Sequence, residues 1–213
     1  MIHLMIKFFN LKKSSLFLLM TTLVISPNLA RADYQKITKA SEIQSEIQEN
    51  DWVFFDIDDT LIRYHYGRYP YLMDFHVLKL MQEFRSEKVK FLGLTARTAD
   101  QGYTDFELKS VGIYLDRYCE SEVYFAGKYS VERGTAPPVL CHQGVLFTGN
   151  ETSKGDLLAQ FMIYLKNQGE SLPRRIIFVD DRKDNLRSVG SVQGILKIIG
   201  IDSVVLFHIQ APE

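Results

Sequence analysis

Acidic, hydroxyl and ammonium side chains follow four apolar runs in this 213-residue sequence. They are Asp56 after WVFF, Thr95 after KFLGL, Lys154 shortly after VLF, and Asp180 with Asp181 after IIFV. Short apolar runs of this kind predict buried strands. Because the carboxyl ends of parallel strands line one crevice, where ligands bind, we expect these side chains to converge although they are far apart in the sequence.

The expected cluster of carboxylates favours a bound cation. Acids that are crowded together repel one another unless a cation lies among them, and hard carboxylate oxygens suit Mg²⁺. Each residue alone also has an ordinary structural explanation, since an acid after a strand commonly caps a helix or a turn. The order of the whole set is therefore more informative than any single member.

Lys154 is notable because its position is unfavourable for a cation. Ser153 and Asp156 are typical of a helix N-cap and its third helical residue, which places Lys154 in the first helical turn. A cation there opposes the positive end of the helix dipole, at a cost of about 0.3–1 kcal/mol. A bound anion would reverse that penalty, because helix N-termini are themselves anion sites.

Strands and helices are expected to alternate along the chain, which is the arrangement that would position these residues. Apolar runs predict strands over residues 52–55, 89–94, 145–147, 176–179 and 204–207. Amphipathic periodicity predicts helices over residues 39–48, 71–85, 154–167 and 185–199, with one more after Thr98. This alternation indicates an α/β fold, a doubly wound parallel sheet with helices on both faces. Residues 114–143 interrupt it and are expected to be a small insertion, such as a hairpin.

Residues 1–32 are typical of a secretory signal peptide. Three lysines precede the apolar run LFLLMTTLVI, which is too short to span a bilayer, and NLARA offers small residues for cleavage after Ala32. An N-terminal membrane anchor is the alternative interpretation. Cleavage would leave residues 33–213 as a single domain, periplasmic or secreted, without a stable membrane span.

Charge and cysteine content limit the partners and the compartment. The formal charge of −1 becomes −5 once the three lysines and one arginine of residues 1–32 are removed. A mildly acidic chain without basic runs is a poor nucleic-acid binder, so no nucleic-acid partner is expected. In an oxidising compartment Cys119 and Cys141 either pair or remain buried free thiols.

The order of the polar residues resembles the motifs of the haloacid dehalogenase-like (HAD) phosphatases across nearly all of residues 33–213. Asp56-Ile57-Asp58-Asp59-Thr60 matches the first motif, D-x-D-x-[TV], and Thr95 matches the second, a Ser or Thr that ends the second strand. Lys154, followed by Gly155, matches the third. The sequence FDIDDT is shared with the secreted acid phosphatases of this superfamily. This chain is shorter than those enzymes and more closely resembles small secreted bacterial HAD proteins.

The fourth motif of the family is an acid followed four residues later by Asp or Asn, and Asp181 with Asn185 matches it. Asp180 occupies the position that Gly or Ser often holds, so either Asp180 or Asp181 is the nearer metal ligand, and the spacing favours Asp181. The resemblance implies a Mg²⁺ ion bound by Asp56, by the backbone carbonyl of Asp58 and by the acids of the fourth motif.

The resemblance also implies a phosphatase mechanism. Asp56 would attack phosphorus and become an aspartyl phosphate, while Asp58 would protonate the leaving oxygen and then activate water. Thr95 would donate a hydrogen bond to a phosphoryl oxygen, and Lys154 would hold the nucleophile and the phosphate together electrostatically.

Three further residues are expected to support or extend this site. Asn185 would orient Lys154 or a metal-bound water. Thr60 would support the residues of the site without binding the metal or the substrate itself. Arg97, two residues after Thr95, either binds the substrate phosphate or pairs with a surface acid.

Short connections predict an open site. Only 34 residues separate Thr60 from Thr95 and 58 separate Thr95 from Lys154, so neither interval holds a large cap of the kind that selects substrates in this superfamily. An open site admits a phosphorylated small molecule or a phosphoprotein. The aromatic run over residues 64–71 either lines the mouth of the site or forms a packed turn.

Other classes of protein fit the motifs less well. A calcium loop needs Gly and Glu where Leu61 and Gly67 stand, and a receiver domain carries its acid pair before its Thr and Lys. A carbon–halogen hydrolase has no need of the expected metal site. The remaining alternative is an exported HAD-like binding or host-interacting module with little catalytic activity, because intact motifs say nothing about rate.

Overall fold

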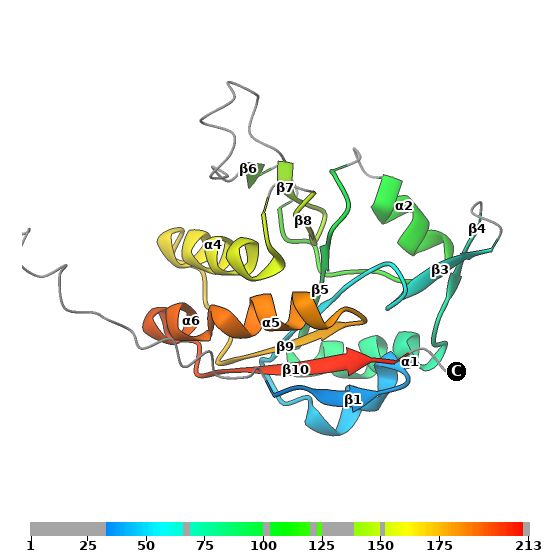
Figure 1. Ribbon diagram of the computed structural model, residues 1–213, viewed down its shortest axis with the longest axis horizontal. Helices are drawn as coiled ribbons and strands as arrows, with labels where there is room; N and C mark the ends of the chain where they lie inside the picture. Colours follow the sequence, from blue (N-terminus) through cyan, green and yellow to red (C-terminus); the bar gives the residue numbers. More distant parts are fainter. Residues whose placement is uncertain are drawn as a thin grey trace, which may run out of the picture. The chain divides into compact units, whose positions relative to one another are not determined.

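A mostly parallel eight-stranded sheet organises the protein in the computed structural model, which describes residues 33–65, 69–99, 103–119, 123–124, 139–149 and 152–210 (Figure 1). The strand order is β1-β10-β9-β2-β5-β8-β7-β6, and all pairs are parallel except those that add β7 and β6 at one edge. The described residues all belong to one compact unit. The strands are β1 (Gln35–Ile37), β2 (Trp52–Phe55), β5 (Lys90–Thr95), β6 (Val123–Tyr124), β7 (Val139–His142), β8 (Val145–Phe147), β9 (Arg175–Asp180) and β10 (Ser203–Ile209).

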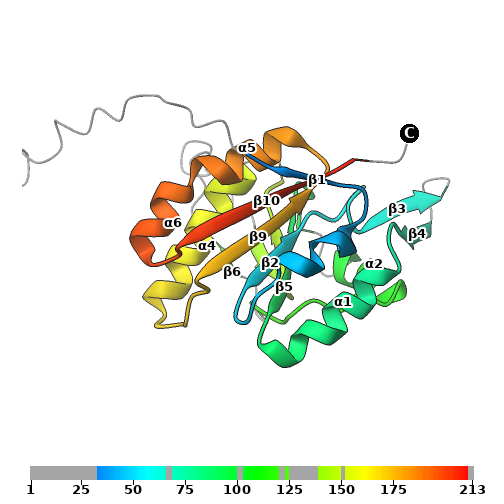
Figure 2. The ribbon, with the colours of Figure 1, turned by 90° about the horizontal axis from the view of Figure 1, so that it is seen from below.

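Helices cover both faces of the sheet, as the two views together show (Figures 1 and 2). Strand β2 alternates between two hydrophobic cores, with Val53 and Phe55 in one and Trp52 and Phe54 in the other. The doubly wound α/β fold predicted from the sequence is therefore confirmed. The first core packs against the 3₁₀ helix η1 (Ala40–Glu46), α1 (His76–Phe84) and α2 (Tyr103–Ser110), and the second against α4 (Lys154–Asn167), α5 (Lys183–Ser191) and α6 (Gln193–Ile199).

The helices of the second face follow the sequence closely, with one correction. Helix α4 has the predicted bounds, and Gly200 ends α6 in the left-handed region at φ 106°. The single helix predicted over residues 185–199 is wrong, because the chain breaks at Val192 into α5 and α6. Gly190 and Gly194 flank the break, and glycine weakens a helix interior by about 1 kcal/mol relative to alanine.

The region after the first motif differs from its predicted structure. The helix predicted over residues 71–85 begins only at His76, while its first residues belong to β4 (Tyr69–Leu72), which pairs antiparallel with β3 (Ile62–His65). Aromatic side chains suit a strand, and Phe75, which the apolar period placed in the core, is 75% exposed. Residues 66–68, in the middle of the aromatic run, lie outside the described residues.

The N-terminal part of the described chain packs along the sheet edge. Strand β1, which has no clear sequence signal, pairs in parallel with β10. The amphipathic segment predicted over residues 39–48 is the shorter helix η1, with Ile43 and Ile47 buried as its four-residue spacing predicts. The signal peptide predicted over residues 1–32 lies outside the described residues. Within the part of the chain that the structure describes, none of the helices has the length and apolar character needed to cross a membrane.

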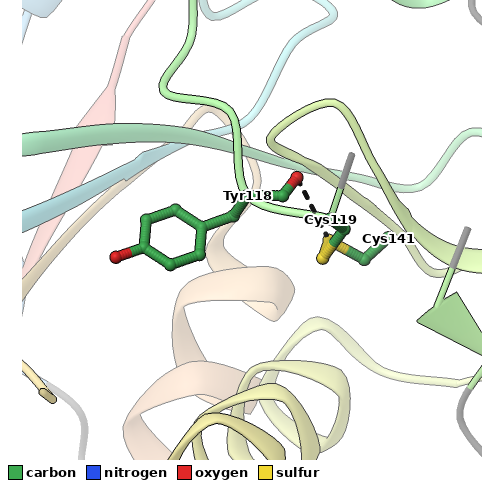
Figure 3. The surroundings of a disulfide bond; sticks show 3 residues. All are labelled: Tyr118, Cys119 and Cys141. Atoms are coloured by element: carbon green, nitrogen blue, oxygen red, sulfur yellow. Dashed lines mark hydrogen bonds between the residues drawn. A yellow bond between two sulfur atoms is a disulfide. The ribbon is translucent and has the colours of Figure 1, made fainter. Parts of the chain in front are cut away.

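The predicted insertion over residues 114–143 contributes strands to the main sheet, since β7 forms a hairpin with β8 and β6 pairs with β7. Cys119 and Cys141 are joined in a disulfide across this region (Figure 3). Of the two states that the sequence allowed, paired or free, the structure shows the paired one. The ring of Tyr118, beside the disulfide, packs against Trp52 and Phe161 of the second core. Residues 120–122 and 125–138 of the predicted insertion lie outside the described residues.

Candidate active site

Three carboxylates meet where two neighbouring strands end. Asp56 follows β2, and Asp180 and Asp181 lie at the end of β9. These strands pair in parallel with Phe55 opposite Val179, and the backbone N–H of Asp56 donates to the carbonyl of Val179 at 2.9 Å. One oxygen of each of the three carboxylates lies within 4.8 Å of the others. The convergence predicted from the strand ends is therefore present for these acids.

Lys154 brings a buried cation to the carboxylates. Its Nζ lies 2.6 Å from Oδ1 of Asp56 and 2.7 Å from Oδ2 of Asp180. Ser153 caps the helix as predicted, because its hydroxyl accepts a hydrogen bond from the N–H of Asp156 at 3.1 Å. The first turn of α4 thus directs the ammonium into the acid cluster, where the two acids compensate the charge that burial would otherwise make costly.

Gly155 allows helix α4 to approach α5 closely enough to place Lys154. A Cβ at this position would lie only 2.1 Å from the carbonyl oxygen of Ser188. The backbone N–H of Gly155 donates to the Ser188 hydroxyl at 2.8 Å. Any larger residue would push the two helices apart, and the lysine beside it would move with α4.

The two acids at the end of β9 have different surroundings. Asp180 is fully buried, and its carboxylate accepts hydrogen bonds from Lys154, from the backbone N–H of Arg182 at 2.7 Å and from the Asn185 amide at 3.0 Å. Asp181 is half-buried, and no other residue of the described chain forms an ion pair or hydrogen bond with its carboxylate. Asn185 therefore orients Lys154 indirectly, through Asp180, whereas neither Lys154 nor Asn185 contacts the Asp181 carboxylate.

The electrostatics of the cluster favour a bound cation. Burial raises the pKa of Asp56 to about 7, with Lys154 opposing and Asp180 reinforcing the shift. Burial also raises the pKa of Asp181, and the nearby charges of Asp180 and Asp59 add to it. Three acids around an ammonium leave an excess of negative charge, and a set of carboxylate oxygens is the donor set that hard divalent cations prefer. The residues present thus fit a divalent metal ion.

Thr95 and Asp58 lie at the same edge of the sheet. Thr95 ends β5, the strand beside β2, and is fully buried, with its hydroxyl accepting from the Arg97 backbone N–H at 3.2 Å. The Asp58 carboxylate is outside the three-acid cluster and pairs with the Arg97 guanidinium at 2.9 and 2.6 Å. Of the two roles predicted for Arg97, pairing with an acid is the one that these contacts show.

Thr60, the last residue of the first motif, is buried, and its predicted supporting role stays a prediction. Its hydroxyl has no hydrogen-bond partner among the described residues. It lines a small cavity of about 150 Å³ together with Thr38, Met73 and Asp74. Such a cavity has room for an ordered water molecule, which would satisfy the hydroxyl.

Several residues of the site carried no signal in the sequence. An open hollow of about 290 Å³ beside Asp181 is lined by Asp59, Arg63 and His208, among others. His208 lies on β10, and its Nε2 is 3.0 Å from the backbone oxygen of Asp181. Arg63 reaches this hollow from the β3–β4 hairpin and His208 through the pairing of β10 with β9, which no local motif reports, whereas Asp59 belongs to the first motif.

The described residues of the aromatic run after the first motif belong to the β3–β4 hairpin. The Tyr64 hydroxyl, on β3, accepts a hydrogen bond from Arg97 and donates one to Glu107 on α2, both at 2.6 Å. Tyr69 and Tyr71, on β4, are exposed. The hairpin therefore brings Tyr64 to Arg97 and Glu107 and leaves Tyr69 and Tyr71 exposed.

The fold and the site define a doubly wound α/β protein with a buried acid–lysine cluster at the carboxyl edge of its sheet. The chain belongs to the family described as "Protein of unknown function (DUF2608)", whose model matches residues 70–211. The matched segment contains Thr95, Lys154 and the β9 acids, and it begins after Asp56 and Asp58. Neither the curated proteins nor the solved structures contain a match to the chain.

Proposed function

We propose that this protein is a Mg²⁺-dependent phosphate monoester hydrolase that acts through an aspartyl-phosphate intermediate, as in the HAD phosphatases that its motifs resemble. One observation carries the proposal. Asp56 is held at 2.6 Å from a buried lysine, inside a cluster of three carboxylates at the carboxyl edge of a parallel sheet. Phosphoryl transfer needs this combination, because a nucleophile and compensation of the phosphoryl charge must be brought to one point.

In the proposed reaction Asp56 attacks phosphorus and the ester P–O bond breaks. The leaving oxygen takes a proton from Asp58 and departs as the alcohol. A water molecule then attacks the aspartyl phosphate and gives a proton to Asp58, which releases inorganic phosphate, restores the carboxylate of Asp56 and returns Asp58 to its protonated form. Thr95 donates a hydrogen bond to a phosphoryl oxygen, and Lys154 neutralises charge that develops beside Asp56.

Asp56 and Asp181 are the proposed side-chain ligands of the metal, with the backbone carbonyl of Asp58 as a third. Bound Mg²⁺ would supply positive charge to the phosphoryl oxygens. The saturated hydrogen bonding of Asp180 supports a different role for that residue. We assign Asp180 to holding Lys154 and Asn185 in place beside the metal site.

The proposed location is outside the cytoplasm, in the periplasm or beyond. Two observations support it, namely the signal-like residues 1–32 and the disulfide between Cys119 and Cys141, which suits an oxidising compartment. The β3–β4 hairpin is the structure that follows the first motif, and strands of the predicted insertion join the sheet edge. This arrangement supports an open site that accepts a phosphorylated small molecule or a phosphoprotein.

The test is hydrolysis of an aryl phosphate by the purified protein with Mg²⁺, compared with the Asp56→Asn variant. We expect phosphate release from the wild type that is abolished by EDTA and reduced at least 1000-fold in Asp56→Asn, since covalent catalysis loses its nucleophile. Equal release from both proteins, or none from either across many phosphate esters and phosphopeptides, would reject the enzyme and favour a binding module.

A further inference from the structure

Arg97 has an acceptor for every N–H group of its guanidinium. Nε donates to Asp58 at 2.9 Å, and Nη2 donates to the other oxygen of Asp58 and to the Tyr64 hydroxyl, both at 2.6 Å. Nη1 donates to Glu107 at 2.6 Å and to the Thr104 hydroxyl at 3.0 Å. A guanidinium has five N–H donors, so none remains for a substrate phosphate.

The contacts of Arg97 with Glu107 and Tyr64 fix its orientation, and the Glu107 carboxylate is buried. The Glu107 side chain is only 3% exposed and forms an ion pair with Arg97. Burial raises the pKa of Tyr64, as does the hydrogen bond to Glu107, so the phenol keeps its proton and can donate to Glu107. A buried acid that lost its cation would leave an uncompensated charge, so Glu107 holds Arg97 in place strongly.

On its other side Arg97 contacts Asp58, whose side chain is much more exposed. The Asp58 side chain is 46% exposed, compared with 15% for Arg97. Bidentate pairing fixes the direction of a carboxylate as well as its distance. The buried half of the network therefore determines where the exposed carboxylate of Asp58 points.

We propose that Arg97 is a positioning residue for Asp58, held by Tyr64 and Glu107, and that it does not bind the substrate phosphate. The inference rests on the proposed function, in which Asp58 moves protons to and from the reacting oxygens. Through this network β3 and α2 are joined to the proton-transferring group. A small misplacement of a reacting group costs about 100-fold in rate, so the network sets the rate without touching the substrate.

A double-mutant cycle on hydrolysis distinguishes positioning from phosphate binding. We expect Arg97→Met to lower kcat by roughly 10- to 100-fold while KM stays within about threefold. Asp58→Asn should lower kcat by roughly 100- to 10,000-fold. If Arg97 acts only through Asp58, the double variant is no slower than Asp58→Asn by more than about threefold. Losses that multiply, or a tenfold rise in KM for Arg97→Met, would overturn the proposal.

Matched variants separate this effect from a loss of folding. Arg97→Met leaves Glu107 without its cation, so the cycle is repeated in a Glu107→Gln background, where that charge is absent. Tyr64→Phe, which keeps the ring and removes one contact of Nη2, should lower kcat by a smaller factor and have no effect once Arg97 is Met. Arg187→Met is the surface control, because Arg187 and Asp184 form an exposed pair on α5.

The outcomes separate the two proposals. A wild type without hydrolytic activity would reject the proposed function, and the role of Arg97 would fall with it. An active wild type in which Arg97→Met and Asp58→Asn act independently would reject the role of Arg97 alone. Non-additive losses in an active protein, with KM unchanged and with Arg187→Met at wild-type rate, would support both.

Discussion

At the scale of single residues, the candidate site combines groups that the fold alone does not favour. Asp56, Asp180 and Asp181 form a cluster of three carboxylates, the ammonium of Lys154 contacts the first two, and burial raises the pKa of Asp56 and Asp181. Crowding acids in this way carries a cost in stability, because each must lose water and repel its neighbours. The arrangement makes physical sense when a cation and a charged substrate complete it.

The raised pKa of Asp56 predicts how the stability of the metal-free protein depends on pH. The folded protein binds a proton at Asp56 up to about pH 7, whereas the unfolded chain releases it near pH 4. Stability contributed by this group is full below pH 4 and is lost as the pH rises through 7. We expect the metal-free wild type to lose more stability between pH 5 and pH 8 than Asp56→Asn does, as measured by thermal unfolding in EDTA. Parallel curves for the two proteins would contradict the shift.

The unlike surroundings of Asp180 and Asp181 predict opposite effects of removing each charge. Asp180→Asn should destabilise the metal-free protein by roughly 1–3 kcal/mol, because buried donors lose a charged acceptor. Asp181→Asn should leave the stability of the metal-free protein unchanged or raised, since it removes a partly desolvated charge from beside Asp180.

The two acids also predict different responses to Mg²⁺ when either one is replaced by asparagine. Bound metal stabilises the folded state by about 2.7 kcal/mol at 100 times its Kd. We expect Mg²⁺ to raise the unfolding temperature of the wild type and to have little effect on Asp181→Asn. If Asp181→Asn responded like the wild type and a folded Asp180→Asn did not, the assignment of the two acids would be reversed.

At the scale of elements, patterns that stay within one segment predicted the structure best. Helix α4 has the predicted bounds because its cap, its apolar face and Gly169 are all local signals. The start of the helix predicted over residues 71–85 was wrong because the three-residue spacing there coincides with β4, whose pairing with β3 decides its conformation. Pairing partners are remote from the segment itself, so such a choice is not visible in its own sequence.

The residues of the candidate site were likewise predictable only where a local sequence feature marks them. The acids at the ends of β2 and β9 could be found because strand ends and motif spacing are sequence features. The partners of Arg97 could not, since Tyr64 and Glu107 reach it from β3 and α2, and their placement depends on tertiary packing. The sequence left its role open between a phosphate and an acid for that reason.

The contact between α4 and α5 predicts an unusual response to a small substitution. Gly155→Ala would place a Cβ 2.1 Å from the Ser188 carbonyl oxygen, so the helices must separate. We expect a loss of about 1–3 kcal/mol, together with slower hydrolysis because Lys154 moves with α4. Gly194→Ala is the matched control, since a Cβ there meets open space within α6 and should raise stability by up to about 1 kcal/mol. Unfolding in urea compares the two, and equal effects would refute close packing as the cause.

At the scale of the whole molecule, the disulfide and strands β6 and β7 lie towards the edge of the sheet opposite to β1. The order of the sheet places β8, β7 and β6 beyond β5, with the acids at β2 and β9 on its other side. Cys141 is buried on β7, while Cys119 comes from the segment that follows α2. The bond therefore joins β7 to the segment after α2 and contacts none of the proposed catalytic residues.

Removing the disulfide should lower the stability of the molecule and leave the chemistry of the site in place. The two cysteines are 22 residues apart, and closing a loop of this size is worth about 3 kcal/mol through restriction of the unfolded chain. We expect Cys119→Ala/Cys141→Ala and the reduced wild type to unfold at the same lower urea concentration, with Mg²⁺ affinity close to that of the oxidised protein. The reductant should not affect the double alanine variant, which serves as the control. Loss of Mg²⁺ binding in a still folded variant would show that the sheet edge and the acid cluster are coupled, contrary to the separation that the strand order implies.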